Sequence, residues 1–249
     1  MTFRDHFSTA AASYAEFRPR YPAALFAHLA GLAPARDAAW DCATGSGQAA
    51  LGLAEHFARV IATDASAAQV AAATAHPRIE YRVAPAERSG LAAASVQLVS
   101  VAQALHWLDQ QAFHAEVRRV VAPGGVAAAW GYALFELDPA VNALVRRFAH
   151  ETLAGWWPPE RRHVDDEYRS LPWPHAELPF PALAIEQPLT LHGLAGYLGT
   201  WSSVLRHREG LGRDPVEPLV RDLAGWWGDA AAPRPVRWPL FGRIGIVAG

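Results

Sequence analysis

The sequence predicts an α/β protein built on a doubly wound, mostly parallel sheet. Short apolar runs alternate with stretches of helical periodicity through the first half of the chain. Strands that alternate with helices pair in parallel through right-handed crossovers, which places helices on both faces of the sheet. In addition, one apolar run ends in an acid and leads through a glycine-rich turn, residues 41–47, into a helix. Such a turn lets a ligand approach the free N–H groups of a helix start.

Composition limits the class of protein. The 249 residues are 51% hydrophobic with a net charge of −2, which fits a single domain over residues 1–249. Basic residues are scattered, so the sequence gives no support for a nucleic-acid or membrane partner. A lone cysteine, Cys42, forms no intrachain disulfide, and no apolar segment is long enough to cross a bilayer. The start of the chain lacks a signal-peptide core, so we expect a cytoplasmic protein.

Residues 1–35 are predicted to form a helical flap. Helical spacing runs over 6–32, is interrupted at Pro19 and Pro22, and resumes over 23–31. Tyr14, Arg18 and Tyr21 either fold over a ligand or lie on a solvated helix face, and their spacing does not decide between these alternatives.

Residues 36–135 contain the predicted core. After the strand that ends at Asp41, strands are expected over residues 59–64, 79–83, 95–101 and 126–130. Helices are expected over residues 48–57, 65–75 and 110–121, the last of them capped by Asp109.

Asp64 ends the second strand, 19 residues after Gly45. A carboxylate at this distance from a glycine turn is typical of a ligand for ribose hydroxyls. The alternative is a helix N-cap, because both Asp64 and Ser66 precede a helical stretch. The spacing favours the ribose role.

Residues 136–235 are predicted to form a cap with one strand, over 183–191, and the last strand is placed at 236–249. Cap helices are expected over residues 139–153, 192–208 and 216–227, with an irregular, proline-rich stretch between about 155 and 181. Seven of the ten tryptophans follow residue 150, and we expect most of them to pack in the cap and one or two to face a substrate. Arg161, Arg162, Arg206 and Arg208 are candidates for binding a carboxylate, although a solvated surface position is the simpler expectation.

Two kinds of cofactor fit the glycine turn. Residues 45–50 match the G-x-G-x-x-A form of a dinucleotide site, which would make the protein an NAD(P)-dependent oxidoreductase. The other candidate is S-adenosyl-L-methionine. Asp41 favours this second candidate, because a carboxylate before the turn repels a pyrophosphate and suits the methionyl ammonium.

The ordered motifs resemble the class I S-adenosylmethionine-dependent methyltransferases, and more narrowly the type-11 small-molecule group with the trans-aconitate methyltransferase-like proteins. The matching pieces lie in family order within residues 6–132, namely 14–22, 41–48, 64–66, 86–87, 103–108 and 123–125. The resemblance implies a Rossmann-like sheet of seven strands whose last strand is antiparallel. One departure is Ala43, which stands where the family has a glycine and leaves the closeness of cofactor approach open.

The resemblance also implies the roles of individual residues. The turn would wrap the methionyl part, Asp64 would hold the ribose, Ala86 and Glu87 would lie beside the adenine, and Gln103 and Ala104 would lie under the methionyl group. The complete set of expected cofactor-binding residues is Tyr14, Arg18, Asp41, Ala43, Thr44, Gly45, Gly47, Gln48, Asp64, Ala65, Ala86, Glu87, Gln103 and Ala104.

We therefore expect methyl transfer to a small-molecule acceptor, at an oxygen atom. The sulfonium activates the methyl group, so the protein has to align the acceptor and exclude water. Tyr21, His106 and Trp107 are expected to border the acceptor, and His106 is the candidate general base if the acceptor needs one. The alternative is that His106 only packs at a strand end. No metal site is expected, and a non-catalytic cofactor-binding protein, without an enclosed acceptor cavity, remains a further alternative.

Overall fold

The computed structural model describes residues 17–248 and contains one central mixed sheet. Parallel pairing joins β3, β2, β1, β4 and β5 in that order, and β8 and then β6 complete the path by antiparallel pairing. The predicted doubly wound, mostly parallel sheet is confirmed. Its strands are β1 (Ala38–Cys42), β2 (Arg59–Asp64), β3 (Ile79–Val83), β4 (Val96–Ala102), β5 (Val121–Tyr132), β6 (Ala176–Leu178) and β8 (Arg234–Ile246).

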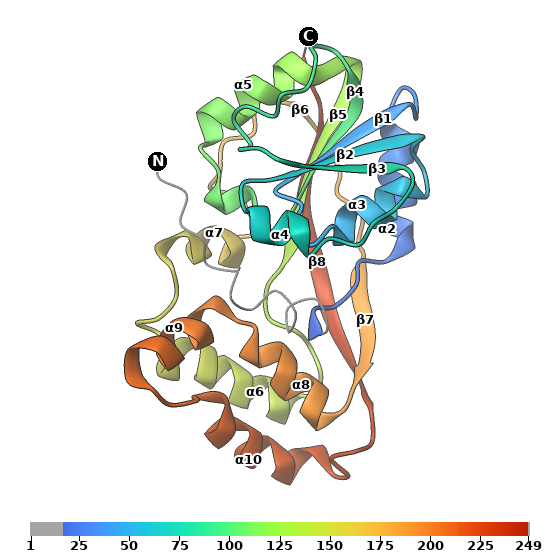
Figure 1. Cartoon of the computed structure of the whole chain (residues 1–249). Helices are drawn as coiled ribbons and strands as arrows, with labels where there is room; N and C mark the ends of the chain where they lie inside the picture. Colours follow the sequence, from blue (N-terminus) through green and yellow to red (C-terminus); the bar gives the residue numbers. More distant parts are fainter. Residues whose placement is uncertain (1–16, 249) are drawn as a thin grey trace.

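Helices cover both faces of this sheet (Figure 1). Residues of α2 and α3 belong to one buried apolar cluster and residues of α5 to the other. Trp40 on β1 packs on Phe113 of α5, while Trp130 on β5 packs on Phe26 of α2, and both indoles are fully buried. The helices of this body are α2 (Ala23–Leu32), α3 (Gln48–Ala54), α4 (Ala67–Ala71) and α5 (Gln110–Val120), with a 3₁₀ turn at Leu105–Trp107.

A group of helices after β5 forms the cap at the foot of Figure 1. Its members are α6 (Pro139–Arg147), α8 (Leu191–Gly199), α9 (Ser202–Leu211) and α10 (Val216–Trp227), with a π-helical turn at Phe148–Thr152 after α6. A 3₁₀ turn at Pro159–Arg161 and α7 (Arg162–Asp165) lead back toward the body.

The prediction of a single helix over 192–208 is wrong, because the structure has two helices in this range. The Thr200 hydroxyl donates to the carbonyl of Tyr197 at 2.6 Å, and Trp201 is extended. A threonine hydroxyl bonded to a preceding carbonyl competes with helix propagation. The helix therefore ends at Gly199 and restarts at Ser202.

The strand β8 is the longest in the sheet and joins cap and body. Its second half pairs with β5 and β6, and its first half pairs with β7 (Ala184–Leu189). The strand expected over 183–191 therefore exists, but it lies beside β8 outside the seven-strand path, in which β6 takes the edge position. Region 136–235 thus contains two strands, β6 and β7, where one is expected. The sequence does not predict β6 because its three residues, before Pro179, give too short an apolar pattern to be recognised.

Other boundaries differ by a few residues. The helices α3 and α4 end earlier than expected, and β5 already begins at Val121, before the Pro-Gly-Gly sequence. Asp109 caps α5 as predicted, with its carboxylate accepting from the N–H of Ala112 at 3.1 Å.

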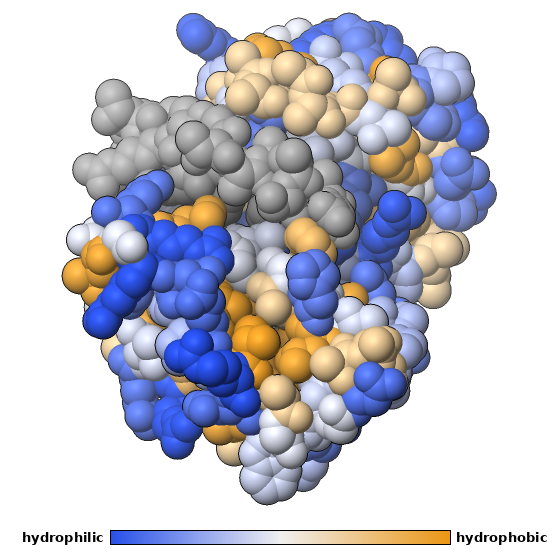
Figure 2. Space-filling model, turned by 60° about the horizontal axis from the view of Figure 1, so that its bottom comes forward, coloured by the Kyte–Doolittle hydropathy of each residue, from blue (hydrophilic) through white to orange (hydrophobic). Residues whose placement is uncertain are grey.

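The cap side of the molecule carries hydrophobic surface in a hollow bordered by hydrophilic side chains (Figure 2). Within the described chain, no helix is long and apolar enough to span a membrane.

Candidate functional site

The glycine turn connects β1 to α3 at the carboxyl edge of the sheet. Its Gly45 N–H donates to the Asp64 carboxylate at 2.8 Å, and its Thr44 N–H donates to the carbonyl of Thr63 at 2.9 Å. Gly47 precedes α3 with φ of 88°, and a Cβ there would lie 2.2 Å from the Tyr81 hydroxyl. The left-handed conformation therefore favours glycine at this position, and a side chain there would also have to displace the Tyr81 ring.

Asp41 lies under the turn and has no exposed surface. Its carboxylate accepts hydrogen bonds from Ser100, at 2.6 Å, and from Thr44. Burial raises the pKa of Asp41 to about 6, so a fraction of this group is neutral near physiological pH. Asp41 thus braces the turn from below, and a direct contact with the cofactor stays a prediction for the bound state.

Ala43 adopts φ of 53°, the left-handed region that glycine occupies without strain. The departure from the family pattern is therefore accommodated by a strained backbone rather than by a different turn. The methyl group lies at a half-buried position.

Asp64 holds the turn, whereas Ser66 caps the following helix. The side chain of Ser66 accepts from the N–H of Gln69, and Asp64 accepts from the N–H groups of Gly45 and Ser66, each at 2.8 Å. Of the two candidates for the helix N-cap, Asp64 and Ser66, Ser66 is therefore the residue that caps α4. The half-exposed Asp64 carboxylate lies beside the turn, as the ribose role requires.

The expected cofactor residue Ala65 follows β2, and the expected adenine residues Ala86 and Glu87 follow β3, the parallel neighbour whose carboxyl end lies at the same edge. Ala65 is half-buried, Ala86 is buried, and the Glu87 carboxylate accepts from the N–H of Asp109 at 3.3 Å. The structure thus brings these three residues to the same edge as the glycine turn.

The N-terminal segment crosses from the cap to the turn. A Cβ at Gly196 of α8 would touch Phe17, and the Gln48 amide of α3 donates to the carbonyl of Pro19 at 3.0 Å. Arg18 lies between these contacts and is half-buried. The expected cofactor residue Tyr14 lies outside the described residues.

Gln103 and Ala104 follow β4, as predicted. Gln103 has φ of 54°, and its amide nitrogen donates to the carbonyl of Tyr132 at 2.9 Å. This bond joins the ends of β4 and β5. Gln103 is also part of the wall of a cavity.

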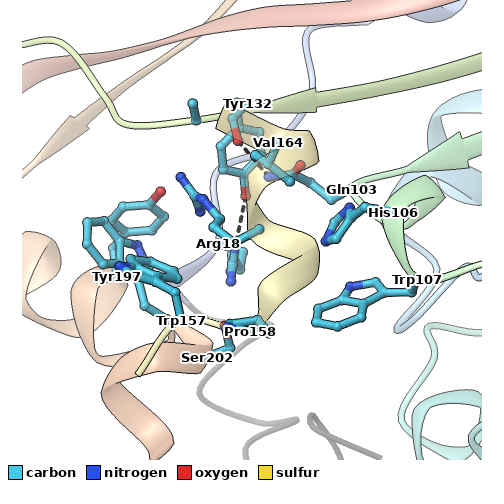
Figure 3. A pocket seen from close by; sticks show the side chains of 13 residues that line it. Arg18, Gln103, His106, Trp107, Tyr132, Trp157, Pro158, Val164, Tyr197 and Ser202 are labelled. Carbon is cyan, nitrogen blue, oxygen red and sulfur yellow. Dashed lines mark hydrogen bonds between the residues drawn. The ribbon is translucent and has the colours of Figure 1, made fainter. Parts of the chain in front are cut away.

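The cavity lies between the end of β4, the N-terminal segment and the cap (Figure 3). The Arg18 guanidinium donates to the Tyr132 hydroxyl at 3.1 Å and lies 5.9 Å from the centre of the Tyr197 ring. Aromatic rings supply most of the wall, namely His106, Trp107, Tyr132, Trp157, Tyr197 and Trp201. Two of the late tryptophans, Trp157 and Trp201, thus border this cavity.

A second guanidinium, that of Arg161, also lines the cavity. It stacks over the Trp157 ring at 4.6 Å, and its Nε bonds the Asp165 carboxylate at 2.9 Å. Among the described lining residues there is no aspartate or glutamate. The cavity is therefore aromatic, with two positive groups.

His106 and Trp107, which are expected to border the acceptor, line this cavity with ring centroids 4.8 Å apart, whereas Tyr21 does not line it. Tyr21 instead packs on Trp130 and Tyr132. Burial and the nearby Arg161 lower the pKa of His106 to about 3, which makes the ring a weak base. The general-base role thus receives no support from its surroundings.

Sequence reasoning missed Tyr132, Val164 and Tyr168. Tyr132 ends β5 and so follows the same carboxyl-edge rule as Gln103, which was an available signal. Val164 and Tyr168 lie in and after α7, in a stretch without a clear pattern. No cluster of three metal-binding side chains is present in residues 17–248.

Comparison with known proteins places this geometry in context. A family model described as a methyltransferase domain matches residues 40–129. A provisionally named methyltransferase of Dictyostelium discoideum is 32% identical over 204 residues, which is 80% of this chain and 78% of that protein.

Solved structures agree. A provisionally named type II methyltransferase from Anaeromyxobacter dehalogenans is 51% identical with a TM-score of 0.87, over 93% of this chain and 98% of that one. An N-methyltransferase of Haemonchus contortus, solved with S-adenosylhomocysteine, shares the fold at a TM-score of 0.50 with 15% identity, over 99% of this chain and 60% of that one.

Proposed function

This chain belongs to the class I S-adenosylmethionine-dependent methyltransferases, and we propose that it transfers the methyl group to a carboxylate oxygen of a small-molecule acid. The observation that carries this proposal is the cavity beside Gln103, which two arginines and no carboxylate line within the described chain. Guanidinium groups bind carboxylates with strong, directional hydrogen bonds. A protonated amine would meet like charge there instead.

The chemistry agrees with the state of His106. A carboxylate oxygen attacks the methyl carbon in line with the sulfur, the O–CH₃ bond forms, and the S–CH₃ bond breaks with its electron pair left on sulfur. The products are a methyl ester and S-adenosylhomocysteine, and no proton is transferred. A cavity whose histidine has a pKa of about 3 suits a reaction without a general base.

We propose that the cofactor lies along the carboxyl edge of the sheet. The turn of Gly45 and Gly47 would hold the methionyl part, Asp64 the ribose, and Ala86 and Glu87 the adenine. The half-exposed Asp64 and the left-handed backbone of the turn support this arrangement. Gln103 would mark the junction with the acceptor, because it follows β4 and lines the cavity.

The other expectations stay proposals. The narrower likeness to the trans-aconitate methyltransferase-like group agrees with an acidic acceptor. Family membership disfavours the oxidoreductase alternative. Family membership likewise disfavours a non-catalytic protein. Cytoplasmic location and the lack of a nucleic-acid partner rest on the sequence alone.

The test is a panel of small acids, each with its matching alcohol and amine, assayed with methyl-labelled S-adenosylmethionine. We expect label in base-labile methyl esters of the acids only. Transfer to the amines or the alcohols would contradict the carboxylate acceptor, and the absence of transfer to any compound or metabolite extract would contradict the enzymatic role.

The variant Arg161→Gln should raise KM for the acid about 10- to 100-fold, as expected for the loss of a hydrogen bond to a charged group. The matched control is Arg162→Gln, because Arg162 is adjacent, exposed and outside the cavity wall. Steady-state kinetics with varied acid distinguish the two variants. If Arg161→Gln and Arg162→Gln changed KM for the acid equally, the proposed role of Arg161 in binding the acceptor would be wrong.

A further inference from the structure

Tyr168 lies behind His106 and outside the cavity wall. Its hydroxyl is 3.1 Å from Nδ1 of His106, and its side chain is fully buried. Tyr168 follows α7, and its ring packs edge-on against Phe241 at 5.2 Å. Its backbone has φ of 64°, a left-handed conformation that is rare for tyrosine. The chain thus holds this hydroxyl against the imidazole in a conformation that local preferences do not explain.

The hydrogen bonds around this hydroxyl determine which group donates. The described chain gives the Tyr168 hydroxyl a hydrogen-bond partner, Nδ1 of His106. Burial raises the pKa of Tyr168 well above its usual range, so the hydroxyl keeps its proton. A buried hydroxyl proton needs an acceptor, and Nδ1 of His106 is the acceptor that the described chain offers. Tyr168 therefore donates to Nδ1.

The imidazole is neutral, since burial lowers the pKa of His106 to about 3. A neutral imidazole carries its single proton on one nitrogen. With Nδ1 acting as an acceptor, that proton resides on Nε2. His106 lines the cavity in Figure 3, and within residues 17–248 no hydrogen bond engages Nε2.

We infer that His106 holds the acceptor through an Nε2–H hydrogen bond instead of removing a proton from it, and that Tyr168 is the positioning residue that selects this tautomer. The inference rests on the proposed function, because a carboxylate is the acceptor that needs a donor and no base. The N–H group would bind one carboxylate oxygen and leave the other oxygen free to attack the methyl carbon. The methyl transfer then moves no proton to or from His106.

Two substitutions at His106 separate a donor from a base. The longer side chain of His106→Gln can place its amide N–H at the position of Nε2, whereas that of His106→Asn can place its amide oxygen at the position of Nδ1 but does not reach the position of Nε2. Both lack a titrating base. We expect His106→Asn to lower kcat/KM for the acid about 10- to 100-fold and His106→Gln to retain most of the activity. Equal loss in both variants, with circular dichroism and Tm unchanged, would overturn the donor role.

The role of Tyr168 is tested by Tyr168→Phe, which keeps the ring and removes the hydroxyl. Nitrogen-15 spectra of the histidine rings distinguish Nε2–H from Nδ1–H imidazole, with His106→Gln identifying the signal. We expect the wild-type ring to be Nε2–H and the variant to lose that preference, together with a several-fold fall in kcat/KM. A wild-type ring protonated at Nδ1, or an unchanged tautomer in the variant, would overturn the inference.

Failure of the proposed function looks different. It would appear as an absence of ester formation by the wild-type enzyme, with the ring spectrum unaffected. Failure of the inference would leave ester formation intact and change only the ranking of the His106 variants or the tautomer.

Discussion

At the scale of single residues, the turn depends on one carboxylate. Both oxygens of Asp64 bond backbone N–H groups, so Asp64 organises the turn and also faces the place expected for the ribose. We expect Asp64→Ala to weaken the binding of S-adenosylhomocysteine by about 1–3 kcal/mol, the range for lost hydrogen bonds to a charged group. Isothermal titration calorimetry measures this, with exposed Glu55→Ala as the control. Unchanged affinity would remove Asp64 from the cofactor site.

Ala43 offers a second measurement at this scale. Its left-handed backbone costs about 1–2 kcal/mol for a residue with a Cβ, while glycine adds backbone entropy to the unfolded chain. We expect Ala43→Gly to raise the free energy of unfolding by up to about 1 kcal/mol on balance.

The matched control for Ala43 is Ala94→Gly, since exposed Ala94 has a similar φ of 49° and lies away from the turn. Urea denaturation should show similar stabilisation by both changes. Tighter binding of S-adenosylhomocysteine by Ala43→Gly alone would show that the methyl group limits the approach of the cofactor. A loss of stability would show that the strain is smaller than the entropic cost.

At the scale of elements, a histidine pair joins α5 to the segment before β6. Nδ1 of His114 lies 3.0 Å from Nε2 of His175, and both side chains are buried. Burial lowers both pKa values, that of His175 to about 4, and Arg118 of α5 and Arg243 of β8 add positive charge nearby. The pair is therefore neutral and hydrogen-bonded in the folded protein.

This pair predicts a pH dependence of stability. An unfolded histidine titrates near 6.5, so between pH of about 6.5 and 4 the unfolded chain binds protons that the folded pair does not. The free energy of unfolding should be largest above pH of about 6.5 and fall by about 1–3 kcal/mol as the pH decreases to about 4. Chemical denaturation at several pH values, with a His114→Asn/His175→Asn double variant, measures this. If the free energy of unfolding fell with pH by the same amount in the variant and in the wild type, the prediction would be contradicted.

Local sequence patterns predict some of the helices and strands but not others. Strands β1 to β5 are recognisable because each is an apolar run or, in β3, an alternation of apolar and polar residues, and because turn signals such as the one after Asp41 separate them. The short strand β6 forms because β8 offers it an edge, which no local pattern encodes. The break between α8 and α9 depends on a hydroxyl bond at Thr200 that helical periodicity does not reveal.

At the scale of the whole molecule, motif spacing predicts the candidate cofactor residues, whereas it identifies only part of the cavity wall. The turn, Asp64 and Gln103 belong to ordered motifs at strand ends, so spacing places them. The cavity brings together Arg18 and Tyr132, which are 114 residues apart, and adds Arg161 from the cap. Such contacts come from tertiary packing, and single arginines or tyrosines carry no pattern that announces them.

The double pairing of β8 sets a condition for exchanging parts between relatives. One continuous strand, Arg234–Ile246, supplies a partner to β7 in the cap and to β5 and β6 in the body. A chimera that takes its cap from another enzyme therefore has no unpaired position within β8 at which the two sequences could be joined. Any junction in this strand falls between residues that pair with a neighbouring strand. Transplanting acceptor preference would require moving β7, the whole of β8 and the strands it contacts as one unit.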